Sequence, residues 1–158
     1  MMQLISLLME NKPGALMRVT GLLSARGYNI ESLTVARTSD PALSRMSILV
    51  EVEPHQRALV IKQMNRLVNV LQAADLSEAP AARRELLLAR IKAPPGNRAA
   101  ILKEAEIFGA RAIDSSPDGF VLEVTSEGEK LEEFIEILGH YGELEVTRSG
   151  MVAVPAAS

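Results

Sequence analysis

The sequence predicts an α+β fold built from two copies of one strand–helix–strand–strand–helix–strand (βαββαβ) unit. Hydrophobic periodicity alternates between strand-like and helix-like spacing in the same order in both halves of the 158-residue chain. Residues 79–84, between the halves, lack periodicity and are predicted to be a linker. Turn residues recur at a shift of 82 positions, which pairs Leu4 with Leu86, Pro13-Gly14 with Pro95-Gly96, and Gly27 with Gly109. This recurrence indicates a duplication.

The first half, residues 1–78, is expected to be one domain. We predict strands over residues 3–9, 30–38, 43–53 and 70–78, and helices over about 14–25 and 54–69. Gly27 follows the first helix, where a left-handed residue commonly ends one. The turn cluster at residues 38–41 joins the second and third strands as a hairpin. The first helix places its apolar stripe at Leu16, Val19, Leu22 and Leu23.

The second helix and the hairpin define the expected core of this domain. Pro54 suits the first turn of the helix. Its buried stripe is expected to be Ile61, Met64, Leu67, Val68 and Leu71. The hairpin strands carry apolar residues spaced by two, which are Leu33, Val35, Met46, Ile48 and Val50. With helices on one face of the sheet only, we expect these residues to be buried against a second copy of the chain.

The second half, residues 85–158, is expected to be the second domain. Its elements are predicted as a strand over 85–92, a helix over about 97–108, a hairpin of 110–115 with 120–125, a helix over 129–141 and a strand over 143–149. Residues 81–158 hold 9 basic and 13 acidic residues, against 8 and 7 in residues 1–80. Most of the acidic excess follows the polar face of the 129–141 helix, which favours a solvated face.

Composition excludes several classes of function. The chain has no cysteine, so disulfides, thiolate metal sites and cysteine nucleophiles are ruled out. No apolar run approaches the ~20 residues of a membrane span, and no secretory signal is recognised at the start, so we expect no membrane association and a cytoplasmic location. Neither half has the basic surface, or the stacking aromatics, of a nucleic-acid binder.

The segment from the first strand to the first helix is the candidate binding site. A strand that enters a helix through Pro13-Gly14 leaves free backbone N–H groups at the helix start, where the helix dipole favours an anion such as a carboxylate. Gly14 lets a ligand approach the backbone. Asn11 and Asn29 are expected to bracket that spot as neutral donors and acceptors. Each of these residues is also common in turns and caps that bind nothing.

The second copy keeps the turns of this segment but not its amides. Asn11 aligns with Ala93, and Asn29 aligns with Arg111. We therefore expect only the first domain to bind a small molecule. The second domain is expected to serve packing, assembly or contact with another protein.

Nothing else in the chain indicates catalysis. His55 and His140 are the only imidazoles and lie far apart in the sequence, which argues against a metal site or a triad. Glu10 and Glu31 lie near the candidate site without a nucleophile or metal partner. No phosphate-binding glycine loop has the required spacing. We expect no catalytic residue, no metal and no cofactor in this chain.

Four segments carry a family resemblance that extends over essentially the whole chain. They are residues 10–16 (ENKPGAL), 26–35 (RGYNIESLTV), 43–46 (LSRM) and 148–150 (RSG). In them the chain resembles the small, regulatory subunit of acetohydroxyacid synthase, also called acetolactate synthase. Segment 26–35 is the most specific, whereas the Pro-Gly loop alone indicates the broader ACT domain class.

The resemblance implies an N-terminal ACT domain followed by a second domain, both ferredoxin-like. ACT domains of this family pair and bind a branched-chain amino acid, typically valine, between them. The subunit activates a large catalytic subunit and confers feedback inhibition, and thiamine diphosphate, magnesium and FAD belong to that partner. The matching ligand residues are Asn11, Lys12, Pro13, Gly14, Ala15 and Leu16, with Asn29 and Ile30 of the neighbouring domain.

The sequence departs from the family pattern at two places. Arg37 replaces a proline that is common there, and residues 151–158 lack the usual continuation of the tail. A free-standing amino-acid-binding ACT regulator without a catalytic partner remains the alternative function. An acylphosphatase-like enzyme of the same topology would need a phosphate cradle, which the sequence does not show.

Overall fold

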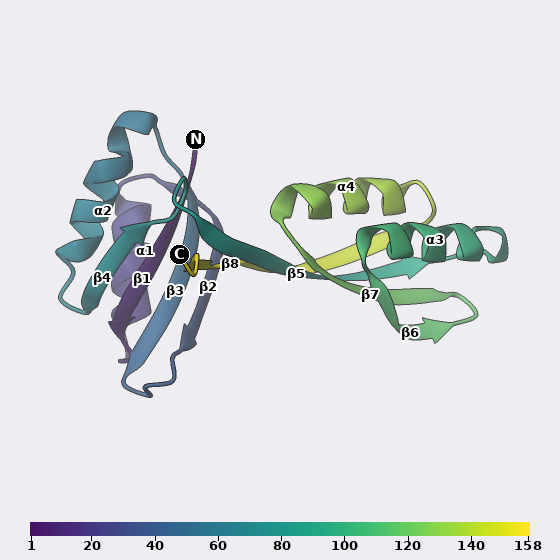
Figure 1. The fold of residues 1–158 in the computed structure, drawn as a ribbon, viewed down its shortest axis with the longest axis horizontal. Coiled ribbons are helices and arrows are strands. Elements are labelled where there is room, and N and C mark those ends of the chain that lie inside the picture. The colour runs from purple at the N-terminus through teal and green to yellow at the C-terminus, as the bar shows by residue number, and fades with distance from the viewer. The chain divides into compact units, whose positions relative to one another are not determined.

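The computed structural model describes residues 1–158 and divides into two compact units. Unit 1 consists of residues 1–82 and 151–158, and unit 2 consists of residues 83–150. Each unit contains the predicted order of strands and helices and one four-stranded sheet (Figure 1). The predicted fold class, α+β with two ferredoxin-like βαββαβ units, is confirmed.

Unit 1 has the strand order β2-β3-β1-β4, with both helices on one face of the sheet (Figure 1). Strand β3 pairs antiparallel with both β1 and β2, so β1 and β2 run in the same direction. The elements are β1 (Met2–Glu10), α1 (Ala15–Ala25), β2 (Asn29–Arg37), β3 (Leu43–Glu51), the 3-10 turn η1 (Pro54–Gln56), α2 (Arg57–Asn65) and β4 (Val70–Asp75).

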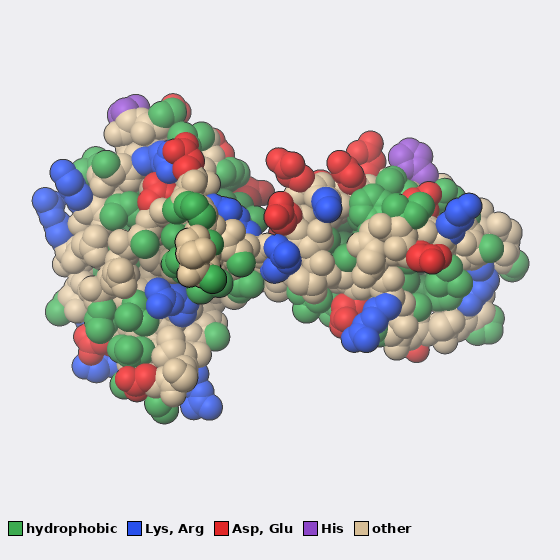
Figure 2. Space-filling view, in the orientation of Figure 1, with side chains coloured by type: hydrophobic (Ala, Val, Ile, Leu, Met, Phe, Trp, Pro, Cys, Tyr) green, Lys and Arg blue, Asp and Glu red, His purple; other side chains and the backbone are tan.

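Unit 2 repeats this arrangement in the order β6-β7-β5-β8. Its elements are β5 (Ala81–Lys92), the 3-10 turn η2 (Pro95–Asn97), α3 (Arg98–Phe108), β6 (Arg111–Ser116), β7 (Gly119–Ser126), α4 (Gly128–Gly139) and β8 (Leu144–Pro155). Phe134 of α4 is its largest fully buried side chain and lies 5.0 Å, centroid to centroid, from the ring of Phe108. Exposed glutamates cover the outer side of α4, where red atoms gather in Figure 2, as the charge pattern predicts.

The two helix ends that the duplication aligns have the same backbone geometry. Gly27 and Gly109 are both left-handed with φ of 74°. After each glycine, the next N–H reaches back to close the helix, from Tyr28 to the Leu23 carbonyl (3.0 Å) and from Ala110 to the Ala105 carbonyl (2.8 Å). These are Schellman motifs, in which the glycine avoids the steric cost of a Cβ. The predicted helix end at Gly27 is confirmed.

Helix α2 is shorter than its hydrophobic pattern predicts. It ends at Asn65, and the chain then turns, with the Val70 N–H donating to the Leu67 carbonyl at 3.0 Å. The expected stripe is therefore wrong at Val68, which is 78% exposed, and at Leu71, an exposed residue of β4. Apolar residues continued at helical spacing past the point where the backbone leaves the helix.

The hairpin residues expected to face a second copy lie on the helix-covered face of the sheet instead. Met46, Ile48 and Val50 are fully buried in the cluster between the sheet and the helices. Their partners Leu33 and Val35 lie opposite Ile48 and Met46, and so on the same face. A period of two shows that residues share a face but does not identify the face. The expectation of burial against a second copy was wrong for this set.

The opposite face of the unit 1 sheet is partly covered by the C-terminal segment of the chain. Leu4, Ser6 and Ser47 point to this face, because they alternate with core residues, and yet they are buried. The Met151 N–H donates to Ser32 Oγ (3.4 Å), and the Ala156 N–H donates to the Pro80 carbonyl (2.9 Å).

The expected domain limits therefore need two corrections. Residues 151–158 cluster with unit 1, whereas the sequence placed them in the second domain. Residues 81–84, expected to be linker, are the first residues of strand β5. The division between the units falls inside the 79–84 stretch, after Ala82.

Arg148 holds the last strand of unit 2 to its first. Its guanidinium donates two hydrogen bonds to the nearly buried Glu85 carboxylate, Nε to Oε1 at 2.7 Å and Nη2 to Oε2 at 3.0 Å. It also pairs with Glu132 of α4. These hydrogen bonds, led by the one to Glu85, raise the pKa of Arg148 above its usual value. The family segment 148–150 thus contains a cross-strand clamp.

We predict that Arg148→Ala destabilises unit 2 by about 2 kcal/mol, because it leaves the Glu85 carboxylate buried without its partner, although Arg148 itself is partly exposed. Urea unfolding followed by circular dichroism measures this change. Arg84→Ala, which removes an exposed cation, is the control and should change stability little. A double variant, Glu85→Met with Arg148→Met, should recover most of the loss.

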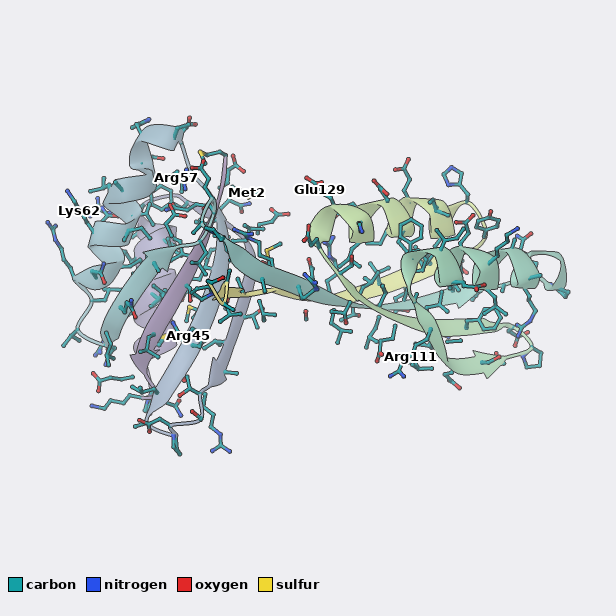
Figure 3. All side chains as sticks on the ribbon, in the orientation of Figure 1. Met2, Arg45, Arg57, Lys62, Arg111 and Glu129 are labelled. Carbon is teal, nitrogen blue, oxygen red and sulfur yellow. The ribbon has the colours of Figure 1, made fainter.

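A second polar cluster joins the start of α2 and the end of β4 to β1 in unit 1. Asp75 accepts hydrogen bonds from Ser77, from Arg57 Nε (3.0 Å) and from Gln3 Nε2 (3.0 Å). Arg57, labelled in Figure 3, stands at the start of α2. Burial by itself raises the pKa of Asp75, but these hydrogen bonds together outweigh burial and hold the pKa below its usual value.

We predict that unit 1 loses stability as the pH falls below about 4, the ordinary range for an aspartate. The depressed pKa of Asp75 gives stability that is fully present above its unfolded-state pKa and is lost as the pH falls through the folded-state pKa. In urea unfolding between about pH 3 and 6, Asp75→Asn should make the free energy of unfolding depend less on pH. Asp114→Asn, at an exposed site on β6, should leave that pH dependence unchanged.

Candidate functional site

Helix α1 begins at the loop that follows β1, and no side chain caps its first turn. Its N-cap is Gly14, left-handed with φ of 84°, and no acidic residue lies in its first turn. Ala15 donates its N–H to the Lys12 carbonyl at 3.2 Å, whereas the N–H groups of Leu16 and Met17 have no backbone acceptor. This start of the helix therefore presents free donors and the positive end of the dipole, as predicted.

Asn11 ties this loop to the β2–β3 hairpin. Its backbone N–H donates to the Ala42 carbonyl (2.8 Å), and its side-chain Nδ2 donates to the Pro41 carbonyl (3.0 Å). The hairpin turn is itself closed by Asp40, whose Oδ1 accepts the Ala42 N–H at 3.0 Å. Asn11 thus positions the loop, and its Oδ1 is the side-chain atom left for a ligand.

Lys12 is engaged by the glutamate that precedes the loop. Lys12 Nζ lies 2.7 Å from Glu10 Oε2, and this pairing lowers the pKa of Glu10. The ion pair is exposed, so its energy is small and is screened by salt. Its consequence for a ligand is that the lysine charge is largely compensated within the loop.

A shallow depression of about 240 Å³ lies between this loop and the end of β2. Four of the predicted site residues, Asn11, Lys12, Ala15 and Leu16, line it together with Met9 and Glu10, whereas Pro13 and Gly14 do not. The opposite side was not predicted as part of a site. It consists of Val35, Ala36 and Arg37 from β2 and Ser44 from β3. The alternation that begins at Leu33 was the available signal, because it places Val35 and Arg37 on the helix side of the sheet.

Asn29 and Ile30 lie far from this depression within one chain. Asn29 pairs with Glu51, which also pairs with Met2 at the start of β1, whereas the loop follows the end of β1. Eight residues of strand at ~3.3 Å each separate these ends by roughly 26 Å. Asn11 and Asn29 of the same chain therefore do not bracket one spot. Ile30 packs against the core of its own unit.

Both units match known sequence families. A family described as the AHAS small subunit-like ACT domain matches residues 5–72, and one described as the small subunit of acetolactate synthase matches residues 84–156. The probable acetolactate synthase small subunit of Archaeoglobus fulgidus is 45% identical over 150 residues, covering 95% of this chain and 94% of that protein. The chain belongs to the family of acetolactate synthase small subunits.

Further relatives extend this kinship over the full length. The acetolactate synthase isozyme 3 small subunit of Salmonella typhimurium is 39% identical over 155 residues, covering 98% of this chain and 95% of that protein. The crystal structure of the acetolactate synthase small subunit from Thermotoga maritima is similar with a TM-score of 0.88 and 33% identity, covering 100% of this chain and 99% of that one. Unit 1 is the ACT domain of the family.

In unit 2, the loop that aligns with the β1–α1 loop of unit 1 has a different backbone and a different surface. The residue that aligns with Gly14 is Gly96, which lies in η2 and is not left-handed. A wider cavity of about 870 Å³ opens between residues 90–95 and the β6–β7 hairpin. Beside it, Arg98 donates to the Ser116 carbonyl (2.7 Å) and stacks over the Phe120 ring at 4.2 Å. Arg98 is therefore engaged by its own unit.

The structure contains no group of three or more histidines and carboxylates that could hold a metal ion. His140 Nδ1 lies 2.8 Å from the Glu136 carbonyl within its own helix. None of the helices has the length and apolarity needed to cross a bilayer.

We predict that Gly14→Ala destabilises unit 1 by about 1 kcal/mol. A Cβ at Gly14 meets no atom within 4 Å, so the whole cost comes from the left-handed backbone at φ of 84°. Gly96→Ala is the matched control, because its Cβ also meets open space but its backbone is not left-handed. Urea unfolding of both variants compares them. Equal effects would show that the left-handed geometry of Gly14 is not maintained in solution.

Proposed function

We propose that the protein is the regulatory subunit of an acetolactate synthase of branched-chain amino acid biosynthesis. It binds a large catalytic subunit, activates it, and confers feedback inhibition when valine or a related amino acid binds to unit 1. Full-length kinship with acetolactate synthase small subunits supports the partner. The uncapped start of α1, reached through a left-handed Gly14, is the observation that supports the effector site.

The effector site is proposed to form between two copies of unit 1. The loop of one copy supplies Asn11 to Leu16, and Asn29 and Ile30 come from the other copy, because they cannot reach the loop of their own chain. Strand β2 supports this pairing, since it is an edge strand with one free side. A homodimer through the ACT units is therefore part of the proposal.

The energetics of such a site suit a metabolite sensor. A few hydrogen bonds to charged groups, at roughly 1.5–3 kcal/mol each and less the cost of ordering, give a dissociation constant near ~10 μM to 1 mM. Inhibition requires that the amino acid binds one arrangement of the complex more tightly than another, with a coupling of about 1–3 kcal/mol. Thiamine diphosphate, magnesium and FAD are assigned to the catalytic partner and not to this chain.

The decisive experiment is reconstitution with the catalytic subunit from the same source. The proposal expects the two chains to co-purify, acetolactate formation to rise on addition of this chain, and valine, leucine or isoleucine to suppress that rise. Calorimetry with each amino acid, with and without the partner, identifies the preferred effector. Amino acid binding without any effect on a large thiamine enzyme would favour the free-standing regulator instead.

We predict that Gly14→Asp abolishes inhibition by valine while activation of the catalytic subunit remains. The new carboxylate stands at the positive end of α1, where it repels the effector's carboxylate. Gly96→Asp, the same change at the aligned position of unit 2, should leave inhibition intact. The readout is acetolactate formation against valine concentration. Wild-type inhibition of the Gly14→Asp complex would exclude this placement of the effector.

A further inference from the structure

Arg37, at the end of β2, lines the depression beside the β1–α1 loop. In the β2–β3 register it lies opposite Ser44, two positions beyond the pair of Val35 with the core residue Met46. Because side chains alternate along a strand, Arg37 shares the sheet face of Val35, which is the face that α1 covers. It lines the depression together with Ala15 and Leu16 of that helix.

The depression keeps one uncompensated positive charge. Three ionisable side chains line it, Glu10, Lys12 and Arg37. Glu10 and Lys12 form an ion pair at 2.7 Å. Arg37 forms no ion pair within its chain, in contrast to Arg57 and Arg148, which are both held by carboxylates. The charge that remains for a ligand is therefore that of the Arg37 guanidinium.

We propose that Arg37 binds the carboxylate of the effector, so that the site favours ligands that carry a carboxylate. A guanidinium presents paired N–H donors that match a carboxylate in two parallel hydrogen bonds. The ammonium is then left for Asn11 Oδ1, because the Nδ2 of that amide is committed to Pro41. Val35 and Leu16, both partly exposed, contact the aliphatic side chain. This inference rests on the proposed function, since it assigns one residue of the same site.

Two classes of ligand follow from this arrangement. Branched amino acids and the corresponding 2-oxo acids both carry the carboxylate and the aliphatic group, and so both should depend on Arg37. An amino acid amide carries the ammonium and the aliphatic group without the carboxylate, and so its weaker binding should not depend on Arg37. The three probes are valine, 3-methyl-2-oxobutanoate and valinamide.

The test is calorimetry on the full chain, with inhibition of the reconstituted complex as a second readout. Arg37→Gln should raise the dissociation constants of valine and of 3-methyl-2-oxobutanoate by the same factor, about three- to tenfold, as expected for loss of a partly exposed charged pair. Valinamide binding should change less than about twofold. Arg37→Lys keeps the charge and should recover part of the loss. Arg66→Gln, which removes an exposed cation elsewhere in unit 1, is the matched control.

The outcomes separate this inference from the proposed function. If valine binds and inhibits the wild-type protein but Arg37→Gln leaves its dissociation constant unchanged, the role of Arg37 is refuted and the proposed function stands. An equal loss for valinamide would also refute it, because it would show a structural effect. If none of valine, leucine and isoleucine binds the wild-type protein, the proposed effector site and the role of Arg37 both fail.

Discussion

The return of the chain through α1 is the constraint on which the candidate site depends. Because the helix carries the chain back along the sheet, β1 and β2 run in the same direction, and the end of one lies far from the start of the other. The loop after β1 therefore meets Val35 and Arg37 at the end of β2. Residues at the start of β2 can reach that loop only from another copy. Pairing of ACT units is thus a geometric condition of the proposed site.

Features that depend on the local backbone were predicted correctly from the sequence, whereas features that depend on tertiary packing were not. Gly27 marked a helix end because a left-handed turn depends on that residue alone. Val68 and Leu71 continued a helical spacing that the backbone had already left at Asn65. Met46 was placed on the wrong face, since alternation specifies which residues lie together and not what they lie against.

The same distinction applies to the candidate site. The position of Gly14 at the uncapped start of α1 could be predicted, because a strand, a Pro-Gly turn and a helix follow one another directly in the chain. The tie of Asn11 to Pro41 could not, since it joins residues 30 positions apart through the fold of the hairpin. Arg37 was visible as a departure from a family pattern, but its place in the depression follows from the β2–β3 register and the packing of α1.

The assignment of residues 151–158 to unit 1 makes unit 2 an insertion within it. The chain leaves unit 1 after Ala82 and re-enters it at Met151, so unit 2 is continuous in sequence and unit 1 is not. During synthesis the inserted unit is therefore complete on the ribosome before the N-terminal one has all its residues. Removal of residues 151–158 would therefore expose part of the unit 1 sheet and leave unit 2 whole.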